Sequence, residues 1–306
     1  MRVLVRSPNW IGDQVMARGA LRALRAFFAA DELVLLAPPP VREVELGVHF
    51  EGFLPVGAPL RGESFDVAVG FPASVSSALA FWRAGIPKRI AFAEPLAKPF
   101  LTRAVPWRGR AAGVHKSALY DRLAELVTGR PVPPVSPPAR SARRVDTLVV
   151  APAASLPLRE WPRHPELWRE LRRRFPRYRI QIVGGSADEA WKPAIARAAD
   201  PGIEDWIGRT SVAEVTRLCG EAAVVVAADS GVAHLSATLA GTPTVVLFGP
   251  GDPAYVIPTG PAVAVRVGDL ACSPCESARC RAPFGYQRCL RDLDVAAVVA
   301  AVERAL

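Results

Sequence analysis

The chain has 306 residues, of which 50% are hydrophobic, and it carries a formal net charge of +9. This length allows two domains of ordinary size, and this hydrophobic content excludes an intrinsically disordered protein. No apolar run approaches the ~18–20 residues of a membrane-spanning helix. The basic charge suits an anionic partner, such as nucleic acid, acidic lipid or a phosphorylated sugar. Because the arginines are scattered and not interleaved with aromatic residues, nucleic acid is the weakest of these choices.

The first residues, Met1–Arg6, read directly as a strand and lack the charged start, apolar centre and cleavage site of a signal peptide. We therefore expect a cytoplasmic protein. The strand at Val3–Ser7 leads through a loop at Pro8–Asp13 to a helix at Gln14–Phe28, whose apolar residues recur at helical spacing. Further strands are predicted at Leu33–Leu36 and Asp66–Val69, and further helices at Ser74–Arg83 and Lys116–Val127.

A proline-rich segment at Pro131–Pro138 divides the chain, because it can neither continue a helix nor join the centre of a sheet. The second half again alternates strands with helices. Its strands are predicted at Thr147–Val150, Arg179–Val183, Ala223–Ala228, Thr244–Phe248 and Ala262–Val267. Its helices are predicted at Pro165–Arg174, Asp188–Ala198, Val212–Gly220, Gly231–Ala240 and Val295–Ala305.

This alternation predicts an α/β protein with two parallel, doubly wound sheets. We place the domains at residues 1–140 and 141–306. In such sheets, ligands bind outside the carboxyl ends of the strands. A cleft between the two domains is therefore the expected site.

The loop after the first strand, Ser7-Pro8-Asn9-Trp10-Ile11-Gly12-Asp13, lies at such a carboxyl edge. Gly12 permits an unusual backbone turn. Asp13 then sits at the helix entrance and faces the cleft. Taken alone, this aspartate is more simply explained as a helix N-cap.

A second segment, Asp229-Ser230-Gly231-Val232-Ala233-His234, joins the buried strand Ala223–Ala228 to a helix. A helix N-terminus offers unpaired N–H groups and a positive dipole end, which suits an anion such as a pyrophosphate. The apolar stripe of this helix runs through Val232 and Leu235, and His234 lies about 200° around the helix from Val232, beside small residues. We therefore predict that His234 faces a ligand. The alternatives are that the acidic residue or the serine only caps the helix, and that the histidine belongs to the core.

Arg159 follows the first strand of the second half, within Ser155-Leu156-Pro157-Leu158-Arg159-Glu160-Trp161-Pro162. A cation across from a helix N-terminus can hold a phosphate. The alternative is a surface arginine, with Trp161 packed beneath the loop. The sequence contains no Gly-x-Gly-x-x-Gly or P-loop pattern, which removes the usual signal for nicotinamide enzymes and kinases.

Four of the five cysteines fall in one short segment, as Cys272-x2-Cys275-x4-Cys280-x8-Cys289. They allow three interpretations: a zinc ion or metal cluster, disulfides, or reduced thiols in a compact loop. The spacing matches no standard zinc motif well. The fifth cysteine, Cys219, lies in a helical stretch and is predicted to be a small core residue.

These segments resemble the heptosyltransferase family (glycosyltransferase family 9), which moves heptose from ADP-heptose to the inner core of lipopolysaccharide. The resemblance rests on PNWIGD at 8–13, REWP at 159–162, DSGVAH at 229–234, GTPTVVLFGP at 241–250 and the four-cysteine tail. The DSGxxH block followed by FGP, at the correct distance from a Gly-Asp loop, is specific, whereas each piece alone is weak. Residues 38–140 carry no motif that matches.

The resemblance implies a GT-B fold of two Rossmann-like domains, with the nucleotide sugar held mainly by the second. It implies that a last helix, at about 294–306, packs back on the first domain. Asp13 would be the general base for an inverting displacement that needs no metal or other cofactor. The implied acceptor is an anionic glycolipid at the inner face of the cytoplasmic membrane. The implied contacts to acceptor or donor are Asn9, Gly12, Arg159, Asp229, Ser230, Gly231 and His234.

Two departures from the family pattern affect the donor side. The family commonly has lysine where this chain has Arg159, which keeps the cation but changes its reach. The acidic residue that holds the ribose in relatives falls by spacing at Ala213, with Glu214 one residue later. Either Glu214 substitutes, or nucleotide selection differs. The alternatives are therefore a transferase for another nucleotide sugar and a non-catalytic sugar-nucleotide-binding protein on the same fold.

Overall fold

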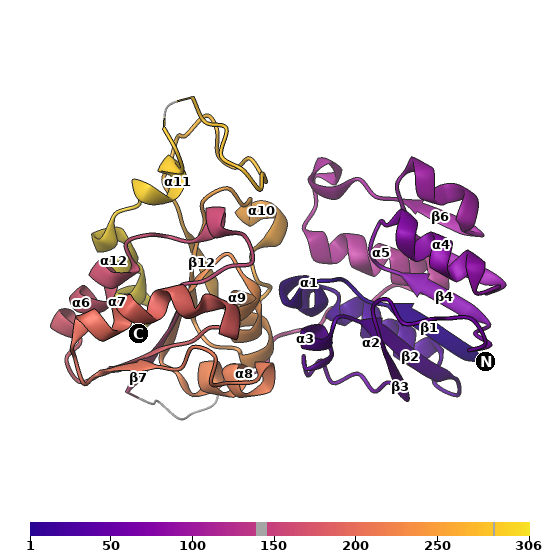
Figure 1. The fold of residues 1–306 in the computed structure, drawn as a ribbon, viewed down its shortest axis with the longest axis horizontal. Helices are drawn as coiled ribbons and strands as arrows, with labels where there is room; N and C mark the ends of the chain where they lie inside the picture. The colour runs from indigo at the N-terminus through magenta and orange to yellow at the C-terminus, as the bar shows by residue number, and fades with distance from the viewer. Residues whose placement is uncertain (139–145, 284) are drawn as a thin grey trace. The chain divides into compact units, whose positions relative to one another are not determined.

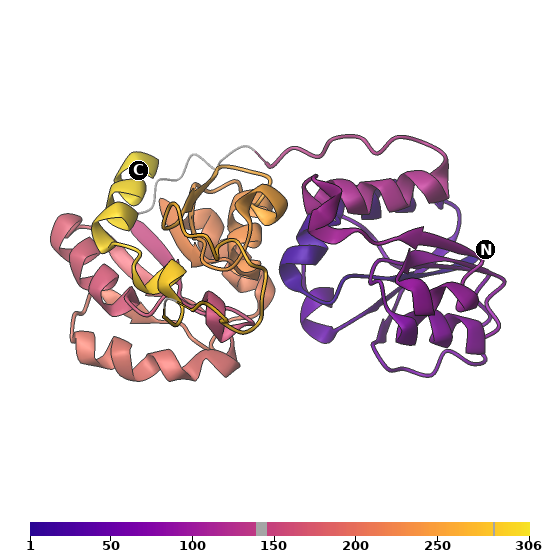
Figure 2. The same ribbon diagram turned by 90° about the horizontal axis from the view of Figure 1, so that it is seen from above.

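A computed structural model describes residues 1–138, 146–283 and 285–306 of the protein (Figure 1). The chain divides into two compact units, Met1–Val135 and Ser136–Leu306. The division falls within the predicted proline-rich segment, which is extended chain without helix or strand (Figure 2). The predicted boundary between residues 140 and 141 lies outside the described residues. Among the described residues, no helix combines the length and the apolar character needed to cross a bilayer.

The first unit is built on a six-stranded sheet that confirms the predicted parallel, doubly wound arrangement. Its strands are β1 (Arg2–Arg6), β2 (Glu32–Ala37), β3 (Gly52–Pro55), β4 (Val67–Gly70), β5 (Lys88–Ala93) and β6 (Arg103–Pro106). They pair in parallel in the order β3-β2-β1-β4-β5-β6, so the chain begins in the middle of the sheet and winds outward in both directions. Val3, Leu4 and Val5 of β1 are completely buried, as a central strand covered on both faces requires.

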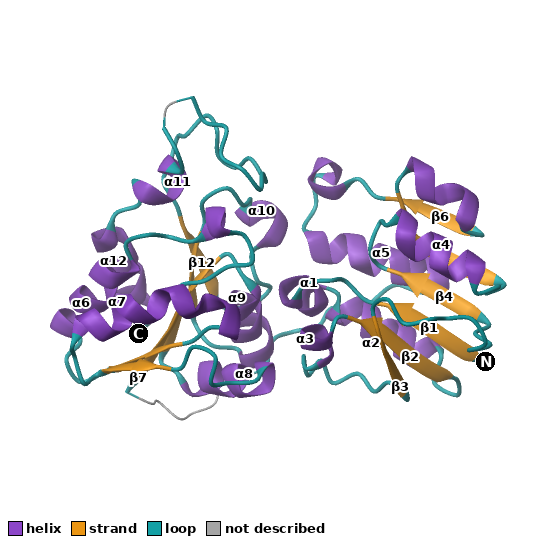
Figure 3. Ribbon diagram, in the orientation of Figure 1, coloured by secondary structure: helices purple, strands orange, loops and turns teal. Residues whose placement is uncertain are grey.

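Helices cover both faces of this sheet (Figures 2 and 3). They are α1 (Ile11–Met16), α2 (Arg18–Phe27), α3 (Pro39–Arg42), α4 (Val75–Arg83) and α5 (Lys116–Thr128), with 3-10 turns η1 (Pro95–Phe100) and η2 (Gly109–Ala112). Helices α2 and α5 pack against each other, and α4 packs with η1. The crossovers from β1 and β4 run in opposite directions, which places α2 and α4 on opposite faces.

The second unit repeats the same sheet order. Its strands are β7 (Thr147–Ala151), β8 (Arg179–Ile182), β9 (Ile203–Asp205), β10 (Val224–Ala228), β11 (Thr244–Leu247) and β12 (Ala262–Val265). They are parallel in the order β12-β11-β10-β7-β8-β9. The first strand of the unit, β7, is therefore central and pairs with β10, and the strand order reverses between these two. Such a reversal is where ligands bind in doubly wound sheets.

The helices of the second unit form two layers. They are α6 (His164–Arg174), α7 (Lys192–Ala198), α8 (Val212–Glu221), α9 (Gly231–His234), α10 (Pro253–Val256), α11 (Arg288–Arg291) and α12 (Val295–Ala305), with short turns η3 (Pro157–Arg159) and η4 (Ser186–Trp191) and the π-helical segment η5 (Leu235–Ala240). Helix α8 packs with η5, and α12 packs with α6 and with β10, β11 and β12. The last helix thus buries its apolar side, including Val298 and Val302, in the core of its own unit.

A cluster of aromatic rings surrounds His164, the first residue of α6. Trp161 and Trp168 are completely buried, and the rings of Trp161 and Trp191 stand edge-on to the imidazole at centroid distances of 5.3 and 5.4 Å. His164 Nδ1 lies 2.7 Å from the carbonyl oxygen of Trp161. Burial lowers the pKa of His164 to about 4. The imidazole is therefore neutral in the folded protein at neutral pH.

We expect the second unit to lose stability as the pH falls from 6.5 to 4. In that window the unfolded chain binds a proton at His164 and the folded chain does not, so protonation favours unfolding. The full shift corresponds to about 3 kcal/mol. Urea unfolding of wild type and His164→Phe at pH 7.0, 5.5 and 4.5 measures this contribution. If both proteins lose stability equally on acidification, His164 is not its source.

Candidate functional site

Asp13 lies in the first turn of α1, just beyond the carboxyl end of β1. The helix begins at Ile11, three residues before the predicted start, so Asp13 is inside it, where a carboxylate interacts favourably with the helix dipole. Its Oδ1 accepts a hydrogen bond of 2.7 Å from Nζ of Lys116, the first residue of α5. The two side chains are 15% and 18% exposed. A partly buried, oriented carboxylate at a sheet edge is suited to accept a proton.

The neighbours of Asp13 differ from the predicted loop. Gly12 is buried inside α1 and is not among the glycines with positive φ, so the predicted unusual turn at Gly12 is wrong. The earlier helix start gives this glycine ordinary helical geometry. Asn9 is exposed, and its Oδ1 accepts a hydrogen bond from the guanidinium of Arg6. Burial lowers the pKa of Arg6 to about 10.

A second group of polar residues gathers at the carboxyl ends of β7 and β10, where the strand order reverses. Arg159 closes the turn η3 after β7, and Asp229 follows β10 directly. Arg159 NH1 lies 3.0 Å from Asp229 Oδ2, as an ion pair rather than an aligned hydrogen bond. Asp229 is only 5% exposed, and Arg159 is 24% exposed. We call this group the Arg159–Asp229 site.

A second carboxylate, on Glu276, holds the other side of the same guanidinium. Arg159 NH2 donates to Glu276 Oε2 at 3.3 Å, and Glu276 Oε1 accepts a 2.6 Å hydrogen bond from the backbone of Asp252. The backbone N–H of Glu276 donates to the carbonyl of Pro250. Because Glu276 follows Cys275 directly, this arrangement ties the cysteine segment to the Arg159–Asp229 site. No sequence pattern predicted a role for Glu276, which lies 117 residues from Arg159.

Ser230 and Gly231 open the helix beside this ion pair. Ser230 occupies the N-cap position of α9 without making a side-chain capping bond, and its Oγ is buried with no hydrogen-bond partner among the described residues. Arg159 Nε is also buried and has no hydrogen-bond partner among the described residues. Unsatisfied buried donors at a sheet edge are available to a polar ligand. A Cβ on Gly251 would lie 2.2 Å from Asp229 Oδ2, so only glycine lets the backbone directly after the FGP segment approach this close.

His234 is buried rather than turned toward open space, with 4% of its surface exposed. The small residues beside it are buried too: Ala237 and Thr238 are 0% and 4% exposed. The continuous helix that α9 and η5 make together is therefore buried on more sides than its apolar stripe. This burial fits the core alternative, and a ligand-facing role for His234 stays a prediction.

Glu214 is engaged in a structural task. It forms a capping box with Ser211 at the start of α8: its Oε2 accepts from the Ser211 backbone N–H at 2.7 Å and from the Ser211 hydroxyl at 2.9 Å. These hydrogen bonds lower the pKa of Glu214. The side chain is exposed, and a contact to ribose stays a prediction.

All five cysteines have free thiols in the structure. Cys219 is completely buried, as predicted, and burial raises its pKa to about 12. Burial and the neighbouring thiols of Cys272, Cys275 and Cys280 raise the pKa of Cys289 to about 11. Hydrogen bonds from the backbone amides of residues 287 and 282 instead lower the pKa of Cys280. In the described parts of the chain, no three or more His, Cys, Asp and Glu side chains are arranged to hold a metal ion.

We expect Cys280 to react with iodoacetamide before Cys289, and Cys219 last, when the folded protein is labelled at pH 7.5. Alkylation needs the thiolate, so the order follows the pKa values and the burial of the thiols. Peptide mass spectrometry over a time course measures this order. Protection of all four clustered cysteines, relieved only by a chelator or only by a reductant, would contradict free thiols and indicate a metal ion or disulfides.

Known proteins similar to this chain identify its family. The profile of glycosyltransferase family 9 (heptosyltransferase) matches residues 54–284, well over half of the chain. The chain belongs to this family. It is therefore a glycosyltransferase, and the resemblance read from its motifs is confirmed. The match includes the Arg159–Asp229 site but begins after Asp13.

Individual relatives agree with the family assignment. The chain is 24% identical to lipopolysaccharide heptosyltransferase 2 of Escherichia coli (strain K12), over 84% of this chain and 85% of that protein. Its fold resembles the structure of E. coli ADP-heptose lps heptosyltransferase II, with a TM-score of 0.78, 22% identity and coverage of 100% and 98%. It also resembles E. coli heptosyltransferase WaaC with ADP-2-deoxy-2-fluoro heptose, with a TM-score of 0.72, 20% identity and full coverage of both chains. The GT-B fold expected from the motifs is thus confirmed.

Proposed function

We propose that this glycosyltransferase moves a heptose from ADP-heptose to an anionic, lipopolysaccharide-core-type glycolipid, with inversion and without a metal ion. The observation that carries the proposal is the Arg159–Asp229 site at the strand reversal of the second unit. Relatives of this chain are named for ADP-heptose and for lipopolysaccharide. The positive charge of the chain suits an anionic acceptor at a membrane surface.

The Arg159–Asp229 site offers groups for each part of such a donor. The N–H groups at the start of α9, the Ser230 hydroxyl and the Arg159 guanidinium are donors suited to a diphosphate. Asp229 repels phosphate oxygens but accepts hydrogen bonds from sugar hydroxyls. Arg159 would then link the two parts, since it already pairs with the carboxylate of Asp229.

Asp13 would act as the general base of the transfer. As the acceptor oxygen bonds to the anomeric carbon, its proton passes to the Asp13 carboxylate and the bond from that carbon to the ADP oxygen breaks. The negative charge that develops on the leaving diphosphate is stabilised by Arg159 and the N–H groups of α9. The ion pair with Lys116 fixes the orientation of the Asp13 carboxylate. A general base needs such a fixed orientation, because it must stay within hydrogen-bond reach of the one hydroxyl that it deprotonates.

A different nucleotide sugar is the second candidate donor. The engagement of Glu214 in the capping box of α8, beside Ala213, favours it, because this carboxylate is held by the helix start. Substrate contacts by Asn9 and His234, which the family pattern implies, are part of the proposed heptose transfer.

The experiment measures nucleoside diphosphate release from ADP-heptose, UDP-glucose and GDP-mannose with a heptose-deficient lipopolysaccharide acceptor, with and without EDTA. We expect turnover with ADP-heptose that EDTA does not change, and a product whose anomeric configuration, read by NMR, is opposite to that of the donor. Preference for another donor supports the second candidate. Absence of turnover with every donor contradicts catalysis of this kind, and loss of turnover in EDTA contradicts metal independence.

A further inference from the structure

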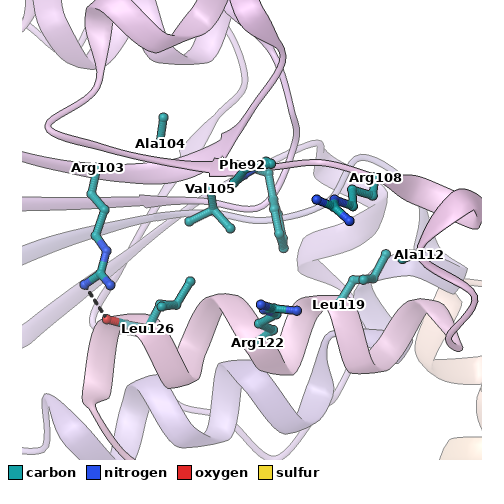
Figure 4. Close-up of a pocket in the computed structure, with 10 residues that line it drawn as sticks. Phe92, Arg103, Ala104, Val105, Arg108, Ala112, Leu119, Arg122 and Leu126 are labelled. Carbon is teal, nitrogen blue, oxygen red and sulfur yellow. Dashed lines mark hydrogen bonds between the residues drawn. The ribbon is translucent and has the colours of Figure 1, made fainter.

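A pocket of about 430 Å³ lies in the first unit, and none of its lining residues has a role above. It opens between the outer strands β5 and β6, the turn η2 and helix α5 (Figure 4). Three of its ten lining residues are arginines, Arg103, Arg108 and Arg122, and none is acidic. Pockets of this size hold small molecules.

Two of these arginines point into the pocket from opposite walls. Arg108 comes from the chain after β6 and Arg122 from the middle of α5, and Figure 4 shows both guanidinium groups directed toward the space beside Phe92. Within the described residues neither forms an ion pair or a side-chain hydrogen bond, whereas Arg103 donates to the carbonyl of Leu126 at 3.1 Å. Both side chains are exposed, so solvent screens their mutual repulsion, and an anion between them would interact favourably with each.

The floor of the same pocket is apolar. Phe92, Val105 and Leu119 line it with hydrocarbon side chains, of which packing leaves 3%, 6% and 8% exposed. The Phe92 ring is held by Trp107, at a centroid distance of 4.9 Å in an edge-on arrangement. A bare inorganic anion would leave this surface in contact with water, whereas a hydrocarbon chain would cover it.

We propose that this pocket binds an amphiphilic phosphate, with the phosphate between Arg108 and Arg122 and its alkyl chain against Phe92, Val105 and Leu119. Guanidinium groups bind phosphate through paired, charge-assisted hydrogen bonds, which gives the head its position. The apolar floor favours a phosphate that carries an alkyl chain over inorganic phosphate, because the chain buries apolar surface. The proposal concerns binding only and does not depend on the reaction proposed above.

Calorimetric titration of the full chain tests it, with decyl phosphate below its micelle concentration and with inorganic phosphate as the headgroup alone. We expect saturable binding of decyl phosphate at least tenfold tighter than that of inorganic phosphate, and at least tenfold weaker in Arg108→Ala/Arg122→Ala. The matched control is Arg22→Ala/Arg130→Ala, which removes the same charge from other exposed positions of the first unit. Thermal unfolding and ADP binding verify that both double variants are folded.

The outcomes are distinct. Equal affinity in both double variants means that net charge alone attracts the anion, and it overturns the proposal. Equal affinity for decyl phosphate and inorganic phosphate overturns the role of the apolar floor, and absence of saturable binding overturns the site. Sedimentation with phosphatidylglycerol vesicles then identifies the source: loss of vesicle binding in Arg108→Ala/Arg122→Ala supports a bilayer headgroup. If the double variant loses specific binding of monomeric decyl phosphate, and vesicle binding is either absent or unchanged by the substitution, the result supports a free amphiphile.

Discussion

Asp13→Asn is expected to lower the turnover number by ~10²–10⁴-fold, the range that a general base contributes. The amide has nearly the shape of the carboxylate but cannot take up the acceptor proton at neutral pH. Donor binding should be unchanged, because the donor groups proposed here belong to the second unit. Steady-state ADP release gives the rate, and calorimetry with ADP gives the affinity.

The control for this substitution is Asp31→Asn in the same unit. Asp31 is also a partly buried aspartate in an ion pair, with the N-terminal amino group at 2.6 Å and 18% exposure. Its loss should cost a similar small amount of stability and leave the turnover number unchanged. If Asp13→Asn keeps the full rate, Asp13 is only a first-turn acid of α1 and its assignment as the base is wrong.

The buried strands β1 and β10 could be predicted from the sequence, whereas the loop after β1 is shorter than predicted because α1 begins at Ile11. The Val-rich runs of β1 and β10 are short, rich in β-branched residues and buried on both faces, which favours strands over buried helices. Strand β5 was not predicted, and neither were the outer strands β3, β6 and β9. These outer strands have three or four residues, contain Gly, Pro or charged residues, and are only partly buried, so no periodic signal marks them.

The partners of the predicted site residues could not be found in the same way. Lys116 lies 103 residues from Asp13, and Glu276 lies 117 residues from Arg159, so no local spacing connects them. The burial of His234 could not be predicted for another reason. Helical periodicity assumes one covered side, whereas the helix through α9 and η5 lies between a sheet and helix α8 and is buried on several sides.

Arg159→Met is expected to weaken ADP binding by ~10–100-fold, because it removes charge-assisted hydrogen bonds worth about 1.5–3 kcal/mol. Arg159→Lys should fall between Met and wild type. A lysine keeps the charge, but its single ammonium group cannot hold Asp229 and Glu276 with separate nitrogens as the guanidinium does. Calorimetry with ADP measures the affinity of each variant, and thermal unfolding measures the cost of leaving Asp229 without this ion pair.

The neighbouring Arg163→Met separates a site effect from a charge effect. Arg163 lies four residues further along the chain. It pairs with Glu166 at 2.7 Å and donates to the carbonyl of Leu293 at 3.3 Å. Its side chain is 35% exposed, and ion pairs as exposed as this one contribute ~0–1 kcal/mol. Arg163→Met removes the same charge four residues along the chain but touches no group of the Arg159–Asp229 site. It should therefore leave ADP affinity within about twofold of wild type. Equal losses in both variants would assign the effect to long-range charge. Wild-type affinity in Arg159→Met would mean that Arg159 serves only to pair Asp229 and Glu276, and that the diphosphate is held by the backbone at the start of α9.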